Sequence, residues 1–194
     1  MATPRGWFDA FPDQITAEDY AKMPEDFSRT IEVIDGHIVK CESPSRVHNR
    51  VAFNITAVLK DGRKPAPCMM VDTDIDVRIT DVPLNFRRPD VTVYRCIADD
   101  KRLYSSDVLL VVEVVSPESS LKTDTVEKKA VYADAGIPIY LIVFLNAAQD
   151  AVEKIEEYWL EPTGAYRLIQ LHTRRLVMDT PIPVDVRLDQ LTSI

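Results

Sequence analysis

The chain has 194 residues, of which 46% are hydrophobic and 28% are charged, a composition that excludes collagen-like, disordered and membrane-spanning proteins. Acidic residues outnumber basic ones by 31 to 23. The net charge of −8 excludes attraction to polyanions through bulk charge, so any contact with nucleic acid must be local. We therefore expect one domain with no membrane segment.

Cysteine usage and the start of the chain indicate the compartment. Cys41, Cys68 and Cys96 are odd in number, widely spaced and without a pair at metal-ligand spacing, which is typical of a reducing compartment. The first residues contain one arginine and no apolar core of a secretory signal. We expect a cytoplasmic location.

Residues 14–42 predict a helix followed by a hairpin. Thr16 with an acid three residues later is typical of a helix start, and Pro24 ends this helix. Two strand-like runs then flank Asp35-Gly36, which is a hairpin turn signal. The runs cover residues 29–34 and 37–41.

A longer helix and a strand are expected next. Ser43-Pro44 is typical of a helix start, and apolar residues recur at helical spacing from Val47 to Leu59, so one face should pack on a sheet. Residues 71–79 alternate in polarity and predict one strand with a wet face. A calcium loop is the alternative for its acids, but the glycine and terminal glutamate of such a loop are missing. These acids are Asp72, Asp74 and Asp76.

The remainder predicts strands around one further helix. Thr123 can cap a helix that runs to Ala135 and ends at Gly136. Strands are expected at 88–94, 108–115, 139–144, 152–160, 165–171 and 182–186. This order predicts an α/β (α+β) fold with a central mixed β-sheet flanked by helices and extra β-hairpins. The single domain, 1–194, would comprise the segment 14–42, a core at 43–145 and a C-terminal β-rich extension at 146–194.

Two acids on neighbouring predicted strands are the candidate metal ligands. Glu113 interrupts an apolar strand, and Asp90 follows Pro89 on the strand before it. An ionised carboxylate in such a strand needs a cation or strong donors, unless it points off a half-exposed sheet, which is the alternative. Two converging carboxylates form the hard-oxygen site that Mg²⁺ or Mn²⁺ prefers, and this favours phosphodiester hydrolysis.

Phosphodiester hydrolysis also requires a cationic group beside the attacking water. Lys128 shares a predicted helix face with apolar Val131 and Tyr132, and it is the candidate for this cation. The alternative is that Lys128 stands at the edge of the apolar face and extends its ammonium into water. Arg87 or Arg88 could meet a phosphate, although exposed charge alone explains both.

Five ordered segments resemble the Uma-type endonuclease family of the PD-(D/E)XK restriction-endonuclease-like superfamily. Together they span about residues 14–145 at family-like spacing. The segments are Ile31-Glu32-Val33-Ile34-Asp35-Gly36, Ser45-Arg46-Val47-His48, Arg88-Pro89-Asp90-Val91, Val112-Glu113-Val114-Val115-Ser116-Pro117, and the set Asp124, Lys128, Tyr132 and Gly136.

The resemblance implies a restriction-endonuclease-like core in which Asp90 and Glu113 bind the metal, with the Val114 carbonyl as a further ligand. The superfamily usually has a lysine two residues after the glutamate, where this chain has Val115. Lys128 is the matching candidate for the lysine role, which is to orient or help deprotonate water.

Two further catalytic residues are implied by the resemblance. Glu32 looks like the upstream glutamate that supports a metal-bound water or a second cation; the alternative is a hairpin carboxylate facing solvent. His48 matches the family's helix histidine and could bond substrate phosphate or Glu32; the alternative is a packing histidine.

These expectations together describe a metal-dependent endonuclease that hydrolyses nucleic acid, with DNA as the expected substrate, a 5′-phosphate product and a homodimer as the expected assembly. Two alternatives remain open. A non-catalytic nucleic-acid-binding or assembly protein could keep the fold, which the acidic balance favours. A phosphohydrolase acting on a small nucleotide would also suit an acidic surface.

Overall fold

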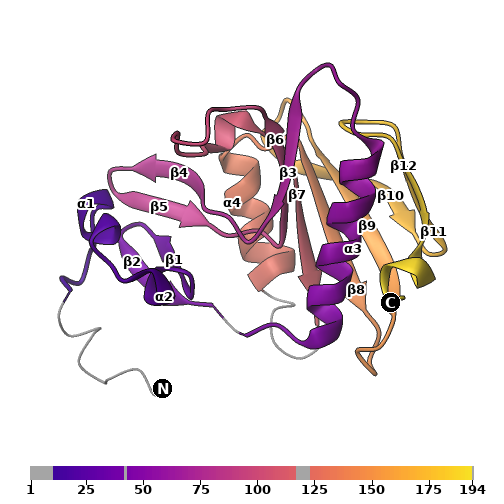
Figure 1. Ribbon diagram of the computed structural model, residues 1–194, viewed down its shortest axis with the longest axis horizontal. Helices are drawn as coiled ribbons and strands as arrows, with labels where there is room; N and C mark the ends of the chain where they lie inside the picture. The colour runs from indigo at the N-terminus through magenta and orange to yellow at the C-terminus, as the bar shows by residue number, and fades with distance from the viewer. Residues whose placement is uncertain (1–10, 42, 117–122, 194) are drawn as a thin grey trace. The chain divides into compact units, whose positions relative to one another are not determined.

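The computed structural model describes residues 11–41, 43–116 and 123–193 (Figure 1). They form two compact units, each made of two stretches of chain. The first unit comprises the residues up to Ser43 together with Asp76–Arg88, and the second comprises Pro44–Ile75 together with the residues from Pro89 onward. Within the described part of the chain, no helix is both long enough and apolar enough to cross a membrane.

The first unit is a four-stranded antiparallel sheet with the order β2-β1-β5-β4 and an apolar core of its own. The predicted hairpin turns at Asp35 and Gly36, which have positive φ angles of 50° and 84°. Thr16 caps the first helix, as expected. The elements are α1 (Ala17–Ala21), α2 (Glu25–Ser28), β1 (Ile31–Ile34), β2 (His37–Lys40), β4 (Val77–Asp81) and β5 (Leu84–Arg87).

The prediction of one strand over residues 71–79 is wrong. The backbone at Asp74 has a positive φ of 53°, which interrupts the extended conformation. β3 therefore ends at Thr73 and β4 begins at Val77, and the two strands belong to different sheets. The row of acids at positions 72, 74 and 76 does not share one wet face.

The second unit is built on a six-stranded mixed sheet with the order β10-β9-β8-β7-β6-β3. Neighbouring strands are antiparallel except β7 and β8, which are parallel. α3 covers one face of this sheet and α4 the other (Figure 1). The elements are α3 (Arg46–Gly62), β3 (Met69–Thr73), β6 (Val91–Arg95), η2 (Ser105–Asp107), β7 (Val108–Val115), η3 (Thr123–Lys128), α4 (Lys129–Asp134), β8 (Ile139–Leu145), β9 (Val152–Leu160), β10 (Tyr166–His172), β11 (Arg175–Met178), β12 (Val184–Arg187) and η4 (Leu188–Leu191).

Both helices of this unit differ in part from the prediction. Ser45, not Ser43, caps α3, because its hydroxyl oxygen accepts a hydrogen bond from the backbone N–H of His48 at 3.1 Å. The second helix is divided into the π-helix η3 and the α-helix α4, and it ends at Gly136 with a φ of 74°, as expected. The prediction that Thr123 is a cap concerns a side chain outside the described part.

The C-terminal extension completes the second unit. β9 and β10 form the predicted hairpin and extend the sheet, while β12 pairs with β11, a strand that the sequence analysis missed. The hairpin β11–β12 and η4 pack on α3. At the end of α3, a Cβ atom added to Gly62 would lie only 2.3 Å from the carbonyl oxygen of Pro183, so the two backbones leave no room for a side chain.

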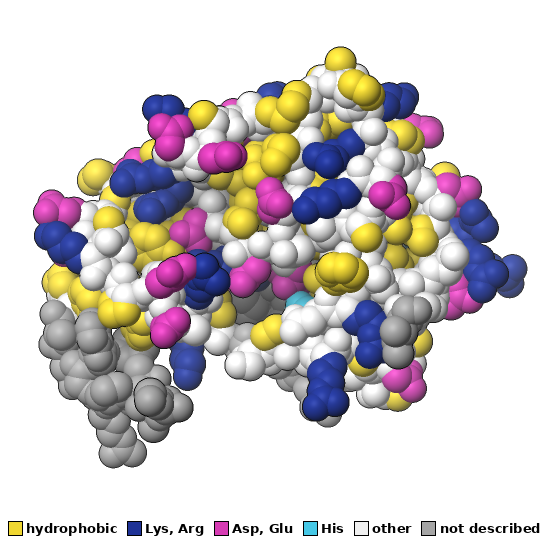
Figure 2. Space-filling view, in the orientation of Figure 1, with side chains coloured by type: hydrophobic (Ala, Val, Ile, Leu, Met, Phe, Trp, Pro, Cys, Tyr) yellow, Lys and Arg dark blue, Asp and Glu magenta, His cyan; other side chains and the backbone are white. Residues whose placement is uncertain are grey.

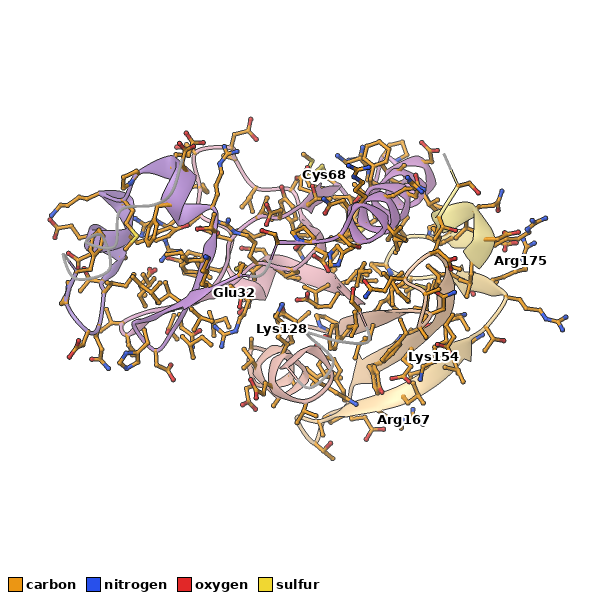
Figure 3. The ribbon with its side chains drawn as sticks, turned by 90° about the horizontal axis from the view of Figure 1, so that it is seen from below. Glu32, Cys68, Lys128, Lys154, Arg167 and Arg175 are labelled. Carbon is orange, nitrogen blue, oxygen red and sulfur yellow. A yellow bond between two sulfur atoms is a disulfide. The ribbon has the colours of Figure 1, made fainter. Side chains whose placement is uncertain are left out.

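Cys68 and Cys96 form a disulfide, which the number and spacing of the cysteines did not predict (Figure 3 labels Cys68). Cys68 precedes β3 and Cys96 follows β6, and the antiparallel pairing of Met69 with Arg95 brings the two cysteine Cα atoms to 5.5 Å. Such a pairing depends on strand register, which cysteine spacing does not reveal. The cytoplasmic location stays a prediction.

Candidate active site

Glu113 is buried in β7, with only 3% of its surface exposed, so the alternative of a carboxylate on a half-exposed sheet is wrong. Its Oε1 atom lies 3.0 Å from the ammonium of Lys128 and accepts a hydrogen bond from the hydroxyl of Tyr132 at 2.7 Å. A cation and a neutral donor thus meet the same oxygen. These contacts offset the loss of hydration that a buried carboxylate suffers.

Lys128 and Tyr132 reach Glu113 together because they are four residues apart, at the junction of η3 and α4, and project from the same side. Figure 3 labels Lys128 on this helix. The next residue, Lys129, has a different surrounding: its ammonium lies 3.5 Å from the ring centroid of Tyr158. Burial lowers the pKa of Lys129, and the carboxylate of Glu156 opposes this shift. The two consecutive lysines therefore have different partners, and Lys128 is the one that contacts Glu113.

Asp90 stands just before β6, at the end of β7 that follows Glu113. Val91 is opposite Val112 in the antiparallel pair of β6 and β7, which places Asp90 beside the next residues of β7. One carboxylate oxygen of Asp90 accepts a hydrogen bond from the backbone N–H of Val114 at 2.7 Å. This N–H belongs to the peptide that joins Glu113 to Val114, so the Asp90 carboxylate lies against the backbone next to Glu113.

The second oxygen of Asp90 lies 2.8 Å from Nε2 of His48 on α3. The His48 side chain is 15% exposed and that of Asp90 is 22% exposed, so both are largely buried. The sequence analysis placed His48 on substrate phosphate or on Glu32, whereas the ring contact in the structure is with Asp90. The histidine orients one of the two acids.

The donor chemistry of these residues fits a magnesium-type ion. Proteins hold Mg²⁺ by one or two carboxylates, with waters and substrate phosphate in the other positions, and Asp90 and Glu113 provide two. Among the described residues, no group of three or more His, Cys, Asp or Glu side chains is placed to hold a metal ion. A closed tetrahedral site of the zinc type is therefore not formed by that part of the chain.

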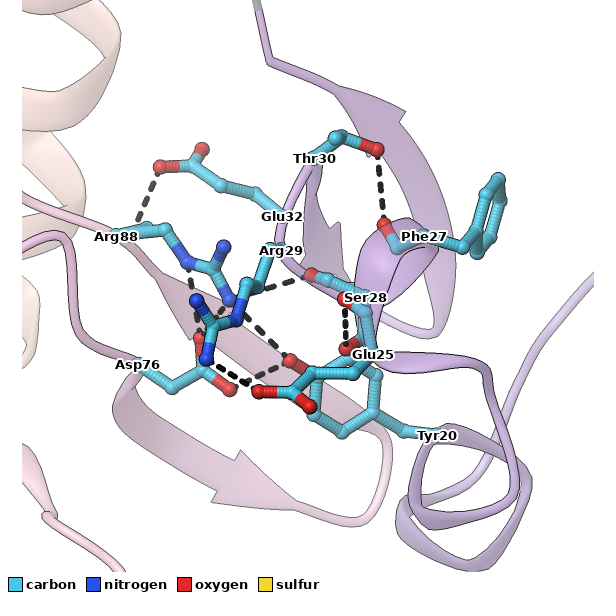
Figure 4. Close-up of polar contacts among 9 residues, drawn as sticks. All are labelled: Tyr20, Glu25, Phe27, Ser28, Arg29, Thr30, Glu32, Asp76 and Arg88. Carbon is cyan, nitrogen blue, oxygen red and sulfur yellow. Dashed lines mark hydrogen bonds and ion pairs between the residues drawn. The ribbon is translucent and has the colours of Figure 1, made fainter. Parts of the chain in front are cut away.

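Glu32 lies on β1 in the first unit and is 7% exposed, so the alternative of a solvent-facing carboxylate is wrong. Its Oε1 atom accepts a hydrogen bond from the backbone N–H of Arg88 at 2.9 Å, as Figure 4 shows. Its Oε2 atom lies 4.0 Å from Nε of Arg87. Both contacts lie within the first unit, and a role of Glu32 at the site around Asp90 and Glu113 stays a prediction.

The two arginines considered as phosphate ligands have structural partners instead. The Arg88 guanidinium lies 2.6 Å from Asp76 and donates to the carbonyl of Ser28 at 3.2 Å (Figure 4). Nη1 of Arg87 donates to the carbonyl of Val33 at 3.1 Å. Both side chains stabilise the fold of the first unit.

Tyr132 is the residue of this site that the sequence analysis did not assign a role. It appeared there as part of an apolar helix face and as a position matching the family, and nothing in that pattern shows that a fully buried tyrosine donates to Glu113. A buried tyrosine hydroxyl normally finds a partner, and this was the available signal. Pro117 and the side chain of Asp124, which also matched the family, lie outside the described part.

Comparison with solved structures shows the fold. The crystal structure of a putative nuclease belonging to DUF820 from Anabaena variabilis ATCC 29413 matches with a TM-score of 0.65 and 14% sequence identity, over 92% of this chain and 97% of that chain. This likeness confirms the predicted α+β fold with a central mixed sheet. No curated protein matches the chain.

Comparison with protein families confirms the resemblance. Residues 17–190 match Uma2, a family described as "Putative restriction endonuclease", and this range includes Glu32, His48, Asp90, Glu113 and Lys128. The match covers most of the sequence. The chain belongs to the Uma2 family.

Proposed function

We propose that the chain is a metal-dependent endonuclease that hydrolyses phosphodiester bonds of DNA. One observation carries the proposal: the Asp90 carboxylate is bound to the peptide that follows Glu113, and the Glu113 carboxylate holds the ammonium of Lys128. Two acids and one cation at the end of a strand are the groups that phosphodiester hydrolysis needs.

Asp90, Glu113 and the Val114 carbonyl would hold Mg²⁺ or Mn²⁺. Such an ion, when bound, lowers the pKa of a water and neutralises charge on the phosphate. The chain's own contribution is to hold the ligands: His48 fixes one oxygen of Asp90, the Val114 N–H fixes the other, and Tyr132 fixes Glu113.

Lys128 would orient the attacking water and stabilise negative charge that develops on the phosphate oxygens. Its side chain is 14% exposed, and a charge in such a partly dehydrated site acts more strongly than one in bulk water. Glu32 would support the metal-bound water or a second cation. The expected product has a 5′-phosphate, and a homodimer is the expected assembly.

A non-catalytic nucleic-acid-binding protein is the second candidate. Both Asp90 oxygens and Oε1 of Glu113 already accept hydrogen bonds or an ion pair from the protein, which favours a site that is internally neutralised. The net charge of −8 also opposes contact with long nucleic acids. This candidate predicts binding without cleavage.

The test is cleavage of supercoiled, linear and single-stranded DNA and of RNA by the purified protein with Mg²⁺ or Mn²⁺. Asp90→Asn keeps the size of the side chain and removes its charge, so we expect cleavage to fall by about 10³-fold. Cleavage that Asp90→Asn leaves unchanged contradicts the proposed site, and binding by a protein that cleaves no substrate supports the second candidate.

A further inference from the structure

We infer that the outer face of α3 is a docking surface for single-stranded nucleic acid. This inference deepens the proposed function, on which it rests for its substrate class. It concerns residues outside the cluster around Asp90 and Glu113.

Residues 46–64, which form α3 and the two residues after it, carry a net positive charge, whereas the whole chain has a net negative charge. Residues 46–64 carry five of the 23 Lys and Arg residues and only one of the 31 Asp and Glu residues. The rest of the chain carries 18 basic and 30 acidic residues, so a local positive segment stands out from an acidic protein. Such a segment attracts phosphates at short range, while the remaining surface repels them.

The positive charges lie along one side of α3. Positions 46, 50, 53, 57 and 60 recur every three or four residues and therefore share one helix face. We call this face the α3 stripe; its residues are Arg46, Arg50, Phe53, Ala57 and Lys60, and Lys64 follows just beyond the helix end. Figure 2 shows dark blue side chains above and below yellow ones over the position of α3. The stripe has basic ends and an apolar centre.

Several of these cations are available to a ligand. Arg46 and Lys64 are exposed and form no ion pair with any residue that the structure describes. Lys60 lies 3.5 Å from Asp72 and Arg50 donates to the carbonyl of Thr192 at 3.3 Å, so these two are partly engaged. Arg46 and Lys64 are therefore the residues to test.

Phe53 indicates which nucleic acid fits. Its side chain lies at the middle of the stripe and is 69% exposed, which is unusual for a phenylalanine on a helix that packs its other face. Single strands bind through basic grooves in which aromatic side chains stack on bases. A duplex hides its base faces, so an exposed phenylalanine between cations favours a single strand.

The stripe begins at the end of α3 that carries His48, and His48 contacts Asp90. Arg46 and Lys60 are separated by 14 residues of helix, which is about 21 Å. Because Arg46 is in the same turn as His48, a strand that follows the stripe would extend away from the candidate site over several nucleotides.

The experiment measures binding with the intact protein in a chelator, so that no cleavage occurs. A fluorescein-labelled 20-nucleotide oligothymidylate, a duplex of equal length and an oligouridylate are titrated at several salt concentrations, with anisotropy as the readout. We expect the doubly substituted Arg46→Gln, Lys64→Gln protein to lose about 1.4 in the slope of log affinity against log salt on the single strand, since each phosphate contact contributes about 0.7.

The matched control is Lys101→Gln, Arg174→Gln, which removes two exposed charges elsewhere. Its slope should stay that of the unsubstituted protein. Phe53→Ala should weaken oligothymidylate binding about tenfold and duplex binding much less, whereas Val82→Ala, at a residue that is 91% exposed, should change neither.

Equal slopes for the stripe variant and its control overturn the inference, and so does tighter binding of the duplex or a Phe53→Ala effect that is equal on both substrates. Failure of the proposed function is a separate result. Loss of binding in the stripe variant, together with no cleavage under any metal condition, supports the docking surface and contradicts the nuclease.

Discussion

Two buried glutamates in the second unit have similar hydrogen-bond partners, but only one of them has a second acid at the adjoining peptide. Glu113 on β7 pairs in register with Ile142, and Glu157 on β9 pairs with Leu141. Since successive residues of β8 face opposite sides of the sheet, the two glutamates lie on opposite faces. They are 3% and 5% exposed.

Each glutamate is held by one basic group and one aromatic donor. Glu157 lies 2.9 Å from Nε2 of His172 and accepts a hydrogen bond from the indole N–H of Trp159 at 2.6 Å. Glu113 has Lys128 and Tyr132 in the same roles. Only Glu113 has a second acid at the adjoining peptide, through the contact of Asp90 with Val114. A buried, well-paired carboxylate is thus no sufficient sign of catalysis, and its acidic neighbour is the informative feature.

The largest expected difference between the two glutamates is in cleavage. Glu113→Gln should lower the rate of DNA cleavage by about 10³-fold, because it removes a negative ligand for the metal. Glu157→Gln should leave the rate within about twofold, and it serves as the matched control for a buried glutamate. Rates with Mg²⁺ at pH 7 check this, and an equal loss in both variants would mean that the sheet is perturbed and the site is elsewhere.

The second difference concerns stability. Lys128→Met removes the cation that lies 3.0 Å from a buried carboxylate and should lower the free energy of unfolding by about 3 kcal/mol. His172→Phe should cost less, about 1–2 kcal/mol, because a histidine can pair with Glu157 while neutral. Urea midpoints at pH 7 check both values. A Lys128→Met protein as stable as the unsubstituted one would contradict the ion pair with Glu113.

The smallest effect is expected for the aromatic donors. Tyr132→Phe removes one hydroxyl from Glu113 and should cost about 1 kcal/mol of stability together with about tenfold in cleavage, since Glu113 loses its fixed position. Trp159→Phe removes the donor from Glu157 and should affect stability alone. Cleavage that is unchanged in Tyr132→Phe would show that the Tyr132 hydroxyl does not position Glu113.

The sequence singled out Glu113 and Lys128 because each breaks a local pattern. Glu113 interrupts an apolar strand and Lys128 stands on an apolar helix face, and the structure brings these two together. The hairpin of the first unit and the positions of β7 and β8 in the sequence were also predicted, since turn residues and long apolar runs are strong local signals.

The contacts that escaped prediction depend on register and packing. The hydrogen bond from Tyr132 to Glu113 and the ring contact of His48 with Asp90 join segments far apart in the chain, and helix periodicity gives no partner for either side chain. The break at Asp74 was hidden because its neighbours keep alternating in polarity. The role of Glu32 at the candidate site stays a prediction.

The close approach of Gly62 to Pro183 bears on how the protein can be engineered. The loop before β12 rests against the last turn of α3, and no residue larger than glycine can be accommodated at position 62 without moving one of them. Shortening the chain before residue 175 would uncover the apolar side of the same helix that presents His48. Engineered variants should therefore leave this final hairpin intact.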